Sequence, residues 1–123
     1  MMPPNFMEPK MKIMHDQHIA VLVKILKESN QYYIIQTNIQ YCTPSEIIGE
    51  IDVLGIGFNI FDIYEVKGNA DNKNMRKAIY QTQLARSHIG QQGSEFIYTP
   101  AAGIESLDRV AERLSRVYKK IKR

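Results

Sequence analysis

Residues 46–68 read EIIGEIDVLGIGFNIFDIYEVKG, and this stretch contains two apolar runs that are rich in β-branched residues. The two runs, 46–55 and 60–68, predict two β-strands. The link between them contains residues that favour a turn: Gly55, Gly57 and Asn59. The pattern therefore predicts an antiparallel hairpin.

The charged side chains of this hairpin include Asp52, Glu65 and Lys67. Glu65 and Lys67 are two positions apart, so they point to the same face of their strand. Charges in an apolar strand are costly to bury without a partner, so three of them in one hairpin indicate a functional site. Two carboxylates are the usual protein contribution to a magnesium site, and a lysine beside them can position a water or a phosphate oxygen.

Apolar periodicity and turn residues predict the remaining elements on either side of the hairpin. Helices are predicted over 14–29, 75–89 and 104–123, and further strands over 32–41 and 95–99. Asn74 is expected to cap the second helix, and Gly90 is expected to end it. The resulting order, α-β-β-β-α-β-α, predicts an α/β domain with a central mixed β-sheet flanked by helices.

Size and composition indicate one domain. The chain has 123 residues, of which 44% are apolar and 24% charged, as is ordinary for globular proteins. Residues 1–12, rich in proline and methionine, are predicted to form a flexible arm, and residues 13–123 a single domain. The apolar runs are far shorter than the ~20 residues of a membrane helix. Because no apolar signal-peptide core precedes the domain and Cys42 is the lone cysteine, we expect a cytoplasmic protein.

The last predicted helix carries an excess of positive charge. Residues 104–123 contain seven Lys or Arg against three acidic residues. Basic residues recur at three- and four-residue steps beside an apolar stripe: Arg109, Arg113, Arg116, Lys120 and Arg123 next to Leu107, Val110, Leu114, Val117 and Ile121. Two interpretations stay open. One is a solvated helix whose charges suit the helix dipole, and the other is a ridge that binds nucleic-acid phosphates.

Other polar and aromatic residues are expected to have structural roles. His15, His18 and His88 lack the spacing of metal ligands, so they are expected at the surface. Glu50 is expected to be a solvated residue at a strand edge. The tyrosines are expected in the core or on a face of the sheet: Tyr32, Tyr33, Tyr64 and Tyr80.

The segment GEIDVLG (49–55) followed by EVKG (65–68) resembles the PD-(D/E)XK nuclease superfamily, and the order of elements over 14–99 is similar to that of the superfamily. The resemblance implies a restriction-endonuclease-like fold. Two groups of the superfamily have similar sequence motifs: the small archaeal and viral Holliday-junction resolvases, and a bacterial endonuclease-like group that reads GEID and then VEVK. YYIIQTN (32–38) resembles the second group. TNIQYCTPSE (37–46) lacks the basic residues that the resolvases carry near the first strand.

This resemblance implies a set of site residues. Asp52, Glu65 and the main-chain carbonyl of Val66 would bind Mg²⁺ or Mn²⁺. Lys67 would activate or position the attacking water. A glutamine on the following helix often joins such sites, and two residues are candidates: Gln81 and Gln83. An acidic residue on the first helix often does so too, and its identity stays open between two residues: Asp16 and Glu28.

The resemblance further implies a metal-dependent endonuclease that hydrolyses DNA phosphodiester bonds, with branched DNA such as a Holliday junction as one candidate substrate. A chain of this size covers few base pairs, so a homodimer is expected to span a duplex or a junction. Two alternatives share the same fold. One is a non-catalytic nucleic-acid-binding module, and the other is a nuclease subunit that needs a partner protein.

Overall fold

The structure, a computed structural model, describes residues 9–122, with side chains described for residues 9–116. Eight elements follow one another in this part of the chain: α1 (Pro9–Ser29), β1 (Ile34–Cys42), β2 (Ile47–Gly57), β3 (Ile60–Val66), α2 (Asn72–Ile89), β4 (Glu95–Thr99), β5 (Gly103–Ser106) and α3 (Leu107–Lys122). Among these helices, none combines the length and the apolar character that crossing a membrane requires.

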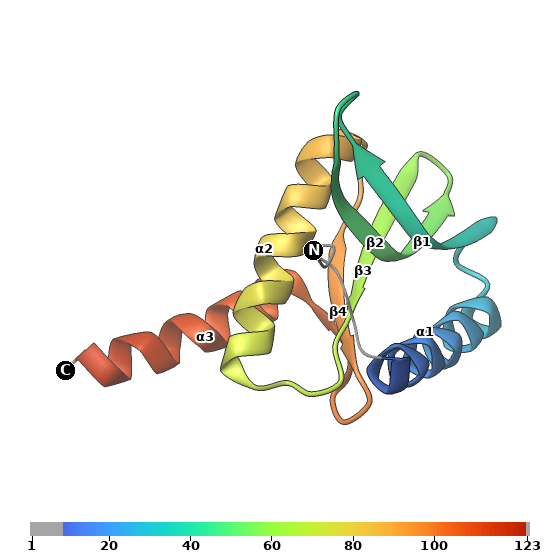
Figure 1. Cartoon of the computed structure of the whole chain (residues 1–123). Coiled ribbons are helices and arrows are strands. Elements are labelled where there is room, and N and C mark those ends of the chain that lie inside the picture. The colour runs from blue at the N-terminus through green and yellow to red at the C-terminus, as the bar shows by residue number, and fades with distance from the viewer. Residues whose placement is uncertain (1–8, 123) are drawn as a thin grey trace.

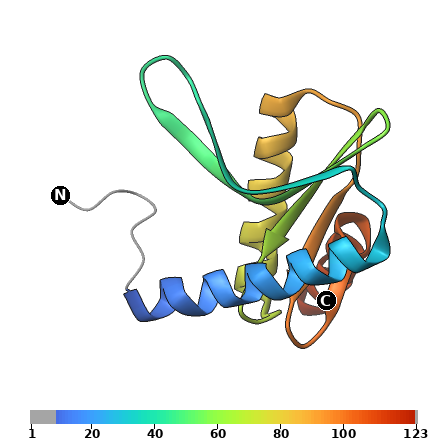
Figure 2. The ribbon, with the colours of Figure 1, turned by 90° about the vertical axis from the view of Figure 1, so that its right-hand side faces the viewer.

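The five strands form one sheet in the order β1-β2-β3-β4-β5. The β3–β4 pair is parallel and the other three pairs are antiparallel. A parallel pair needs a crossover connection, which α2 provides. In Figure 1, α1 lies on one side of the sheet, and α2 and α3 lie on the other. Figure 2 shows α1 running across the sheet and the β1–β2 hairpin extending beyond the body of the domain.

The α/β class with a central mixed sheet flanked by helices is confirmed, and its element order is that expected of the restriction-endonuclease-like fold with one strand more. The additional strand is β5, which the sequence analysis assigned to the connection and the start of the last helix. Four residues are too few to show an alternating pattern. The strand forms because Gly103, with a φ of 73°, turns the chain back so that it pairs with β4.

All three helix starts differ from the predicted ones, and that of α3 moves from residue 104 to Leu107 because β5 precedes it. The helix α1 begins at Pro9 and not at residue 14, so residues 9–12 of the predicted arm are helical; residues 1–8 lie outside the described part. Proline suits the first helical position because its missing N–H is not needed there. The cap of α2 is Asp71 and not Asn74, because the Asp71 carboxylate accepts the backbone N–H of Asn74 at 2.7 Å. Gly90 ends this helix as predicted, with a φ of 64°.

Buried residues line both faces of the sheet. On one face, the α1 residues Ile19, Leu22 and Leu26 pack in a cluster with residues of the sheet: Val53, Tyr64, Val66 and Tyr98. On the other face, residues of α2, β4 and α3 pack together: Met75, Ala78, Ile97, Leu107 and Val110. Because Ile97 and Tyr98 are adjacent in β4, they point to opposite faces. The two clusters therefore hold the three helices against β4, with α1 on one face of the sheet and α2 and α3 on the other.

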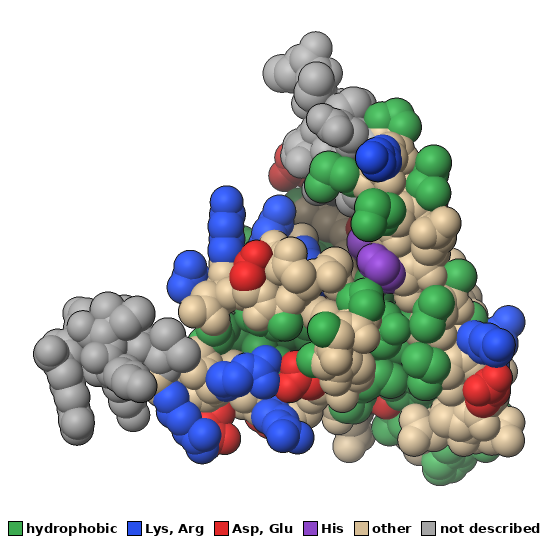
Figure 3. All heavy atoms as spheres, turned by 90° about the horizontal axis from the view of Figure 1, so that it is seen from below, with side chains coloured by type: hydrophobic (Ala, Val, Ile, Leu, Met, Phe, Trp, Pro, Cys, Tyr) green, Lys and Arg blue, Asp and Glu red, His purple; other side chains and the backbone are tan. Residues whose placement is uncertain are grey.

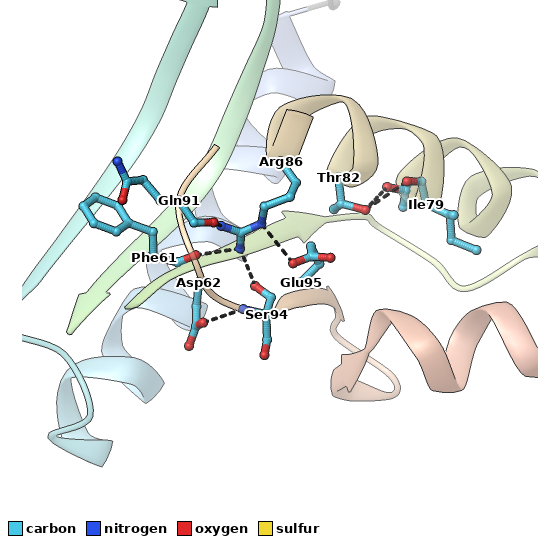
Figure 4. Close-up of polar contacts among 9 residues, drawn as sticks. Phe61, Asp62, Ile79, Thr82, Arg86, Gln91, Ser94 and Glu95 are labelled. Carbon is cyan, nitrogen blue, oxygen red and sulfur yellow. Dashed lines mark hydrogen bonds and ion pairs between the residues drawn. The ribbon is translucent and has the colours of Figure 1, made fainter. Parts of the chain in front are cut away.

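The side chain of Arg86 holds the C-terminal end of α2 against the sheet (Figure 4). The guanidinium of Arg86 donates hydrogen bonds to three main-chain carbonyls, those of Phe61 at 2.6 Å, Gln91 at 2.6 Å and Ser94 at 3.1 Å. Its Nε donates to the carboxylate of Glu95 at 3.1 Å. These contacts hold α2 in register with β3 and β4, and thus fix its position over the sheet.

We expect Arg86→Met to lower the free energy of unfolding by about 2–3 kcal/mol, because it leaves several main-chain carbonyls and one carboxylate without a donor. Chemical denaturation of the purified variant measures the change. Arg113→Met is the matched control, since Arg113 forms an exposed ion pair with Glu105 that is worth less than about 1 kcal/mol. Equal losses in the two variants would show that Arg86 does not fix α2.

Candidate active site

The two predicted metal ligands lie on neighbouring strands at the centre of the sheet. The antiparallel register pairs Val53 with Tyr64, so Asp52 and Glu65 occupy the next positions along β2 and β3. Both residues are buried, with exposed fractions of 6% for Asp52 and 5% for Glu65. The hairpin therefore brings together the two carboxylates that the sequence singled out, away from bulk water.

The Asp52 carboxylate is held by two groups that approach the same oxygen. Its Oδ2 accepts the backbone N–H of Val66 at 2.8 Å. The Nε2 atom of His15 lies 3.5 Å from that oxygen. These two contacts fix the carboxylate plane from β3 and from α1, so the orientation of the group is set by two different elements.

Glu65 is the most perturbed group of the site. Its pKa is raised well above the ordinary value, first by burial and then by the negative charge of Asp52, while the charge of Lys67 opposes the shift. The Nζ atom of Lys67 lies 3.8 Å from Glu65 Oε1, and its side chain is only 15% exposed. The ammonium is thus held at the edge of the carboxylate pair. This position agrees with the prediction that Glu65 and Lys67 point to the same face of their strand.

His15 is a site residue that the sequence analysis placed at the surface. It is half-buried, and its pKa is raised chiefly by its hydrogen bond with Asp52, against the effect of burial. The expectation was wrong because the spacing of His15 was compared only with that of other histidines. His15 precedes Ile19 and Leu22 by four and seven residues, so it continues the buried stripe of α1 toward the sheet.

Neither candidate acid of α1 reaches the carboxylate pair. Asp16 is exposed and pairs with Lys12 at 3.2 Å, one turn earlier on the same helix. Glu28 is exposed near the C-terminal end of α1. Glu50, expected to be solvated, is half-buried, and its pKa is raised first by burial and then by the charge of Asp52. A third carboxylate therefore stands close to the pair, on β2 itself.

Gln81 is better placed than Gln83 for a role at the site. Gln83 is exposed, whereas the Oε1 atom of Gln81 is buried with no hydrogen-bond partner among the described residues. The neighbouring turns of α2 carry Ala78 and Ala85, which pack in the clusters of Ile97 and Ile63 respectively. Glu65 follows Ile63 by two positions in β3 and pairs with Ile97 of β4. Gln81 stands between Ala78 and Ala85 along α2, so it lies on the part of the helix that covers Glu65.

The oxygen donors of the site determine which ion it could hold. Within the described residues, no group of three or more His, Cys, Asp or Glu side chains could hold a metal. The structure supplies two buried carboxylates, and the main-chain carbonyl of Val66, the residue after Glu65, is the third hard oxygen donor that the sequence resemblance implies. Magnesium keeps several waters when it binds to protein, so a set of this size and chemistry fits it. The raised pKa of Glu65 fits as well, since a nearby cation would relieve the repulsion between the carboxylates.

The predicted basic ridge on α3 is partly engaged in ion pairs. Arg113 donates two hydrogen bonds to the Glu105 carboxylate, at 2.7 and 3.1 Å, and Arg116 pairs with Glu112. Arg109 is exposed, and the side chain of Lys120 lies outside the described residues. Phosphate binding by α3 stays a prediction, and Arg113 would have to leave its acid to make such a contact.

Fold and site together define an α/β domain with a buried carboxylate pair and an adjoining lysine. No family model matches the chain, and no curated protein matches it. A solved structure described as "Crystal structure of SSO0001" is 17% identical, with a TM-score of 0.48, over 89% of this chain and 61% of that one. The chain thus spans about three-fifths of the length of that protein, and a similarity of this level bears on neither activity nor site.

Proposed function

We propose that the protein is a magnesium- or manganese-dependent endonuclease that hydrolyses phosphodiester bonds in DNA. The observation that carries the proposal is the buried pair of Asp52 and Glu65, with the ammonium of Lys67 3.8 Å from Glu65. Burying two neighbouring carboxylates and a lysine costs stability, so a domain that keeps them gains function from them. Phosphodiester hydrolysis uses this combination of an anionic metal site and a nearby cation.

The roles follow from the positions of the groups. Asp52, Glu65 and the Val66 carbonyl would hold the ion, which supplies charge neutralisation at the phosphate and lowers the pKa of water. Lys67 donates hydrogen bonds that orient the attacking water or a phosphate oxygen. The orphan carbonyl oxygen of Gln81 is available to accept a hydrogen bond from that water.

His15 and the Val66 N–H act differently, since both contact the Oδ2 atom of Asp52. They hold that carboxylate in place and do not need to touch the substrate. This division resembles that of other metal sites, in which groups behind the ligands fix their orientation.

A panel of DNA substrates tests the proposal. We expect cleavage of at least one of four substrates, a duplex, a flap, a splayed arm and a four-way junction, with Mg²⁺ or Mn²⁺ and none with a chelator. Binding without cleavage of any substrate would favour a non-catalytic DNA-binding module. Cleavage that appears only after a cell extract is added would favour a subunit that needs a partner.

A homodimer remains part of the proposal, because two copies would place two sites on the two strands of a duplex or junction. Sedimentation velocity at several protein concentrations measures the state of the full chain. A monomer at all concentrations, free and with DNA, would remove the dimer from the proposal without affecting the chemistry of the site.

A further inference from the structure

One face of α2 combines three basic residues with an exposed aromatic ring. Lys73, Arg76, Lys77 and Tyr80 are spaced at i, i+3, i+4 and i+7, so they lie along a single helical face. All four are exposed, and the Tyr80 side chain has an exposed fraction of 65%. The sequence analysis placed Tyr80 in the core or on the sheet, and the structure corrects this. The buried face of α2 lies opposite: Met75, Ala78, Thr82 and Ala85.

The charge of this face is not neutralised locally. Among the described residues, Lys73, Arg76 and Lys77 form no ion pair, in contrast to Arg113 and Arg116 of α3. The helix α2 itself contains no acidic residue. Its N-terminal end carries the positive end of the helix dipole, which the carboxylate of the capping residue Asp71 partly offsets. Figure 3 shows Lys and Arg side chains gathered on the part of the molecular surface that lies toward α2 and α3.

A short loop connects the N-terminal end of this face to the candidate active site. Only residues 68–71 separate Lys67 from the start of α2. This loop is held by hydrogen bonds in which Asn69 Oδ1 accepts the backbone N–H of Asp71 at 3.1 Å and the side-chain amide of Asn74 at 2.9 Å. Lys73 is therefore fixed at a short distance along the chain from the catalytic lysine.

The helix that carries this face also packs over the strand that holds Glu65. Ala78 of α2 packs in a cluster with Ile97, and Ile97 pairs with Glu65 in the β3–β4 ladder. The ring of Tyr41 of β1 lies 5.1 Å from that of His88, on the last turn of α2. The buried face of α2 therefore covers the sheet beside Glu65, and the basic face lies on the exposed side of the same helix.

We propose that this face of α2, the α2 track (Lys73, Arg76, Lys77 and Tyr80), binds a single strand of DNA that leads to the carboxylate pair. The three basic side chains contact neighbouring phosphates of the strand, and the Tyr80 ring stacks on an unpaired nucleobase. Lys73 and Lys77 lie one turn apart, about 6 Å along the helix, a span that fits about two phosphates of one strand. The proposal rests on the proposed function for its substrate, and it deepens that function by naming an unpaired strand as what the site recognises.

The exposed ring of Tyr80 favours binding of a single strand over binding of a duplex. In a duplex the bases are already stacked on one another, so an exposed side-chain ring has no free base face to cover. Basic residues interleaved with an exposed aromatic ring are the usual means of binding single-stranded nucleic acid. DNA with an unpaired segment, such as a flap or a splayed arm, presents both features.

The experiment uses the full chain carrying Asp52→Asn, so that binding is measured without cleavage. Fluorescence anisotropy compares an oligothymidylate with a duplex of the same length. We expect tighter binding of the single strand, and Tyr80→Ala is expected to weaken that binding about tenfold while Tyr80→Phe leaves it nearly unchanged. Each of Lys73→Ala, Arg76→Ala and Lys77→Ala should flatten the slope of log affinity against log salt by about 0.7.

Matched controls lie elsewhere on the surface. Tyr33→Ala removes a tyrosine that is also exposed, and the double change Lys24→Ala with Lys27→Ala removes two exposed lysines of α1. The controls should change neither affinity nor salt slope. Three kinds of result would each overturn the α2 track. They are equal losses in the controls, tighter binding of the duplex or of an RNA oligomer, and an unchanged affinity in Tyr80→Ala.

The fate of the proposed function is separable from this result. If the chain with Asp52 intact cleaves DNA but the α2 track variants bind and cleave as the unsubstituted protein does, the track alone fails. If no substrate is cleaved with Mg²⁺ or Mn²⁺ yet the track variants lose single-strand binding as expected, the endonuclease proposal fails and the track stands as a DNA-binding surface.

Discussion

Asp52→Asn is expected to reduce metal-dependent DNA cleavage by a factor on the order of 10³, and Glu65→Gln should have a similar effect. Each change removes one negative oxygen ligand with almost no change in volume. The amide oxygen of Asn can still accept the Val66 N–H that Asp52 accepts at 2.8 Å, so the hairpin keeps its geometry. Single-turnover cleavage of the best substrate of the panel measures the loss. Near-normal Mg²⁺-dependent activity in either variant would falsify the assignment of the site.

Thermal unfolding without metal serves as the control for these two variants. Because the folded protein raises the pKa of Glu65, the stability that this group contributes is fully present below its ordinary value of 4.5 and is lost as the pH rises toward the folded pKa. Glu65→Gln removes this loss. We therefore expect the variant to melt at a higher temperature than the unsubstituted protein at neutral pH, and at a similar temperature near pH 4. A lower melting temperature at neutral pH would show that Glu65 is structural.

The sequence predicted the centre of the fold well because that centre is local. Asp52 and Glu65 belong to one hairpin, so the turn and the alternation of side chains suffice to place them on adjacent strands. Gly90 ends α2 for an equally local reason, since its backbone conformation favours glycine. Features of this kind depend on neighbours in the chain, and single-sequence patterns contain that information.

The features that the sequence analysis missed depend on contacts between distant segments. His15 contacts Asp52 only because α1 crosses the sheet. The spacing of residues within α1 does not indicate which strand the helix covers. The strand β5 exists because β4 offers it an edge. Tyr80 was expected to pack because tyrosine is often half-buried, and its exposure follows from which face of α2 the sheet covers. The orphan oxygen of Gln81 likewise appears only once the helix is placed.

Lys67→Ala is expected to lower the maximal rate of cleavage by roughly 10²–10⁴-fold while DNA and metal affinity change little. The Lys67 ammonium lies 3.8 Å from Glu65 Oε1 and is largely buried, so its contribution is made at the reacting groups and not on the open surface. An interaction made only in the transition state lowers kcat and kcat/KM together, whereas a simple anchor raises KM alone. Steady-state kinetics over a wide range of DNA concentrations separates the two cases.

Lys24→Ala provides the reference for this measurement, because it removes the same charge from an exposed position on α1. Its rate and KM should match those of the unsubstituted protein. If saturating DNA restores the full rate to Lys67→Ala, the lysine is a phosphate anchor, and the water must then be oriented by other groups, of which Gln81 is the nearest candidate on α2. If the rate stays low at saturation while anisotropy shows normal DNA binding, Lys67 acts in the chemical step, as the proposed function expects.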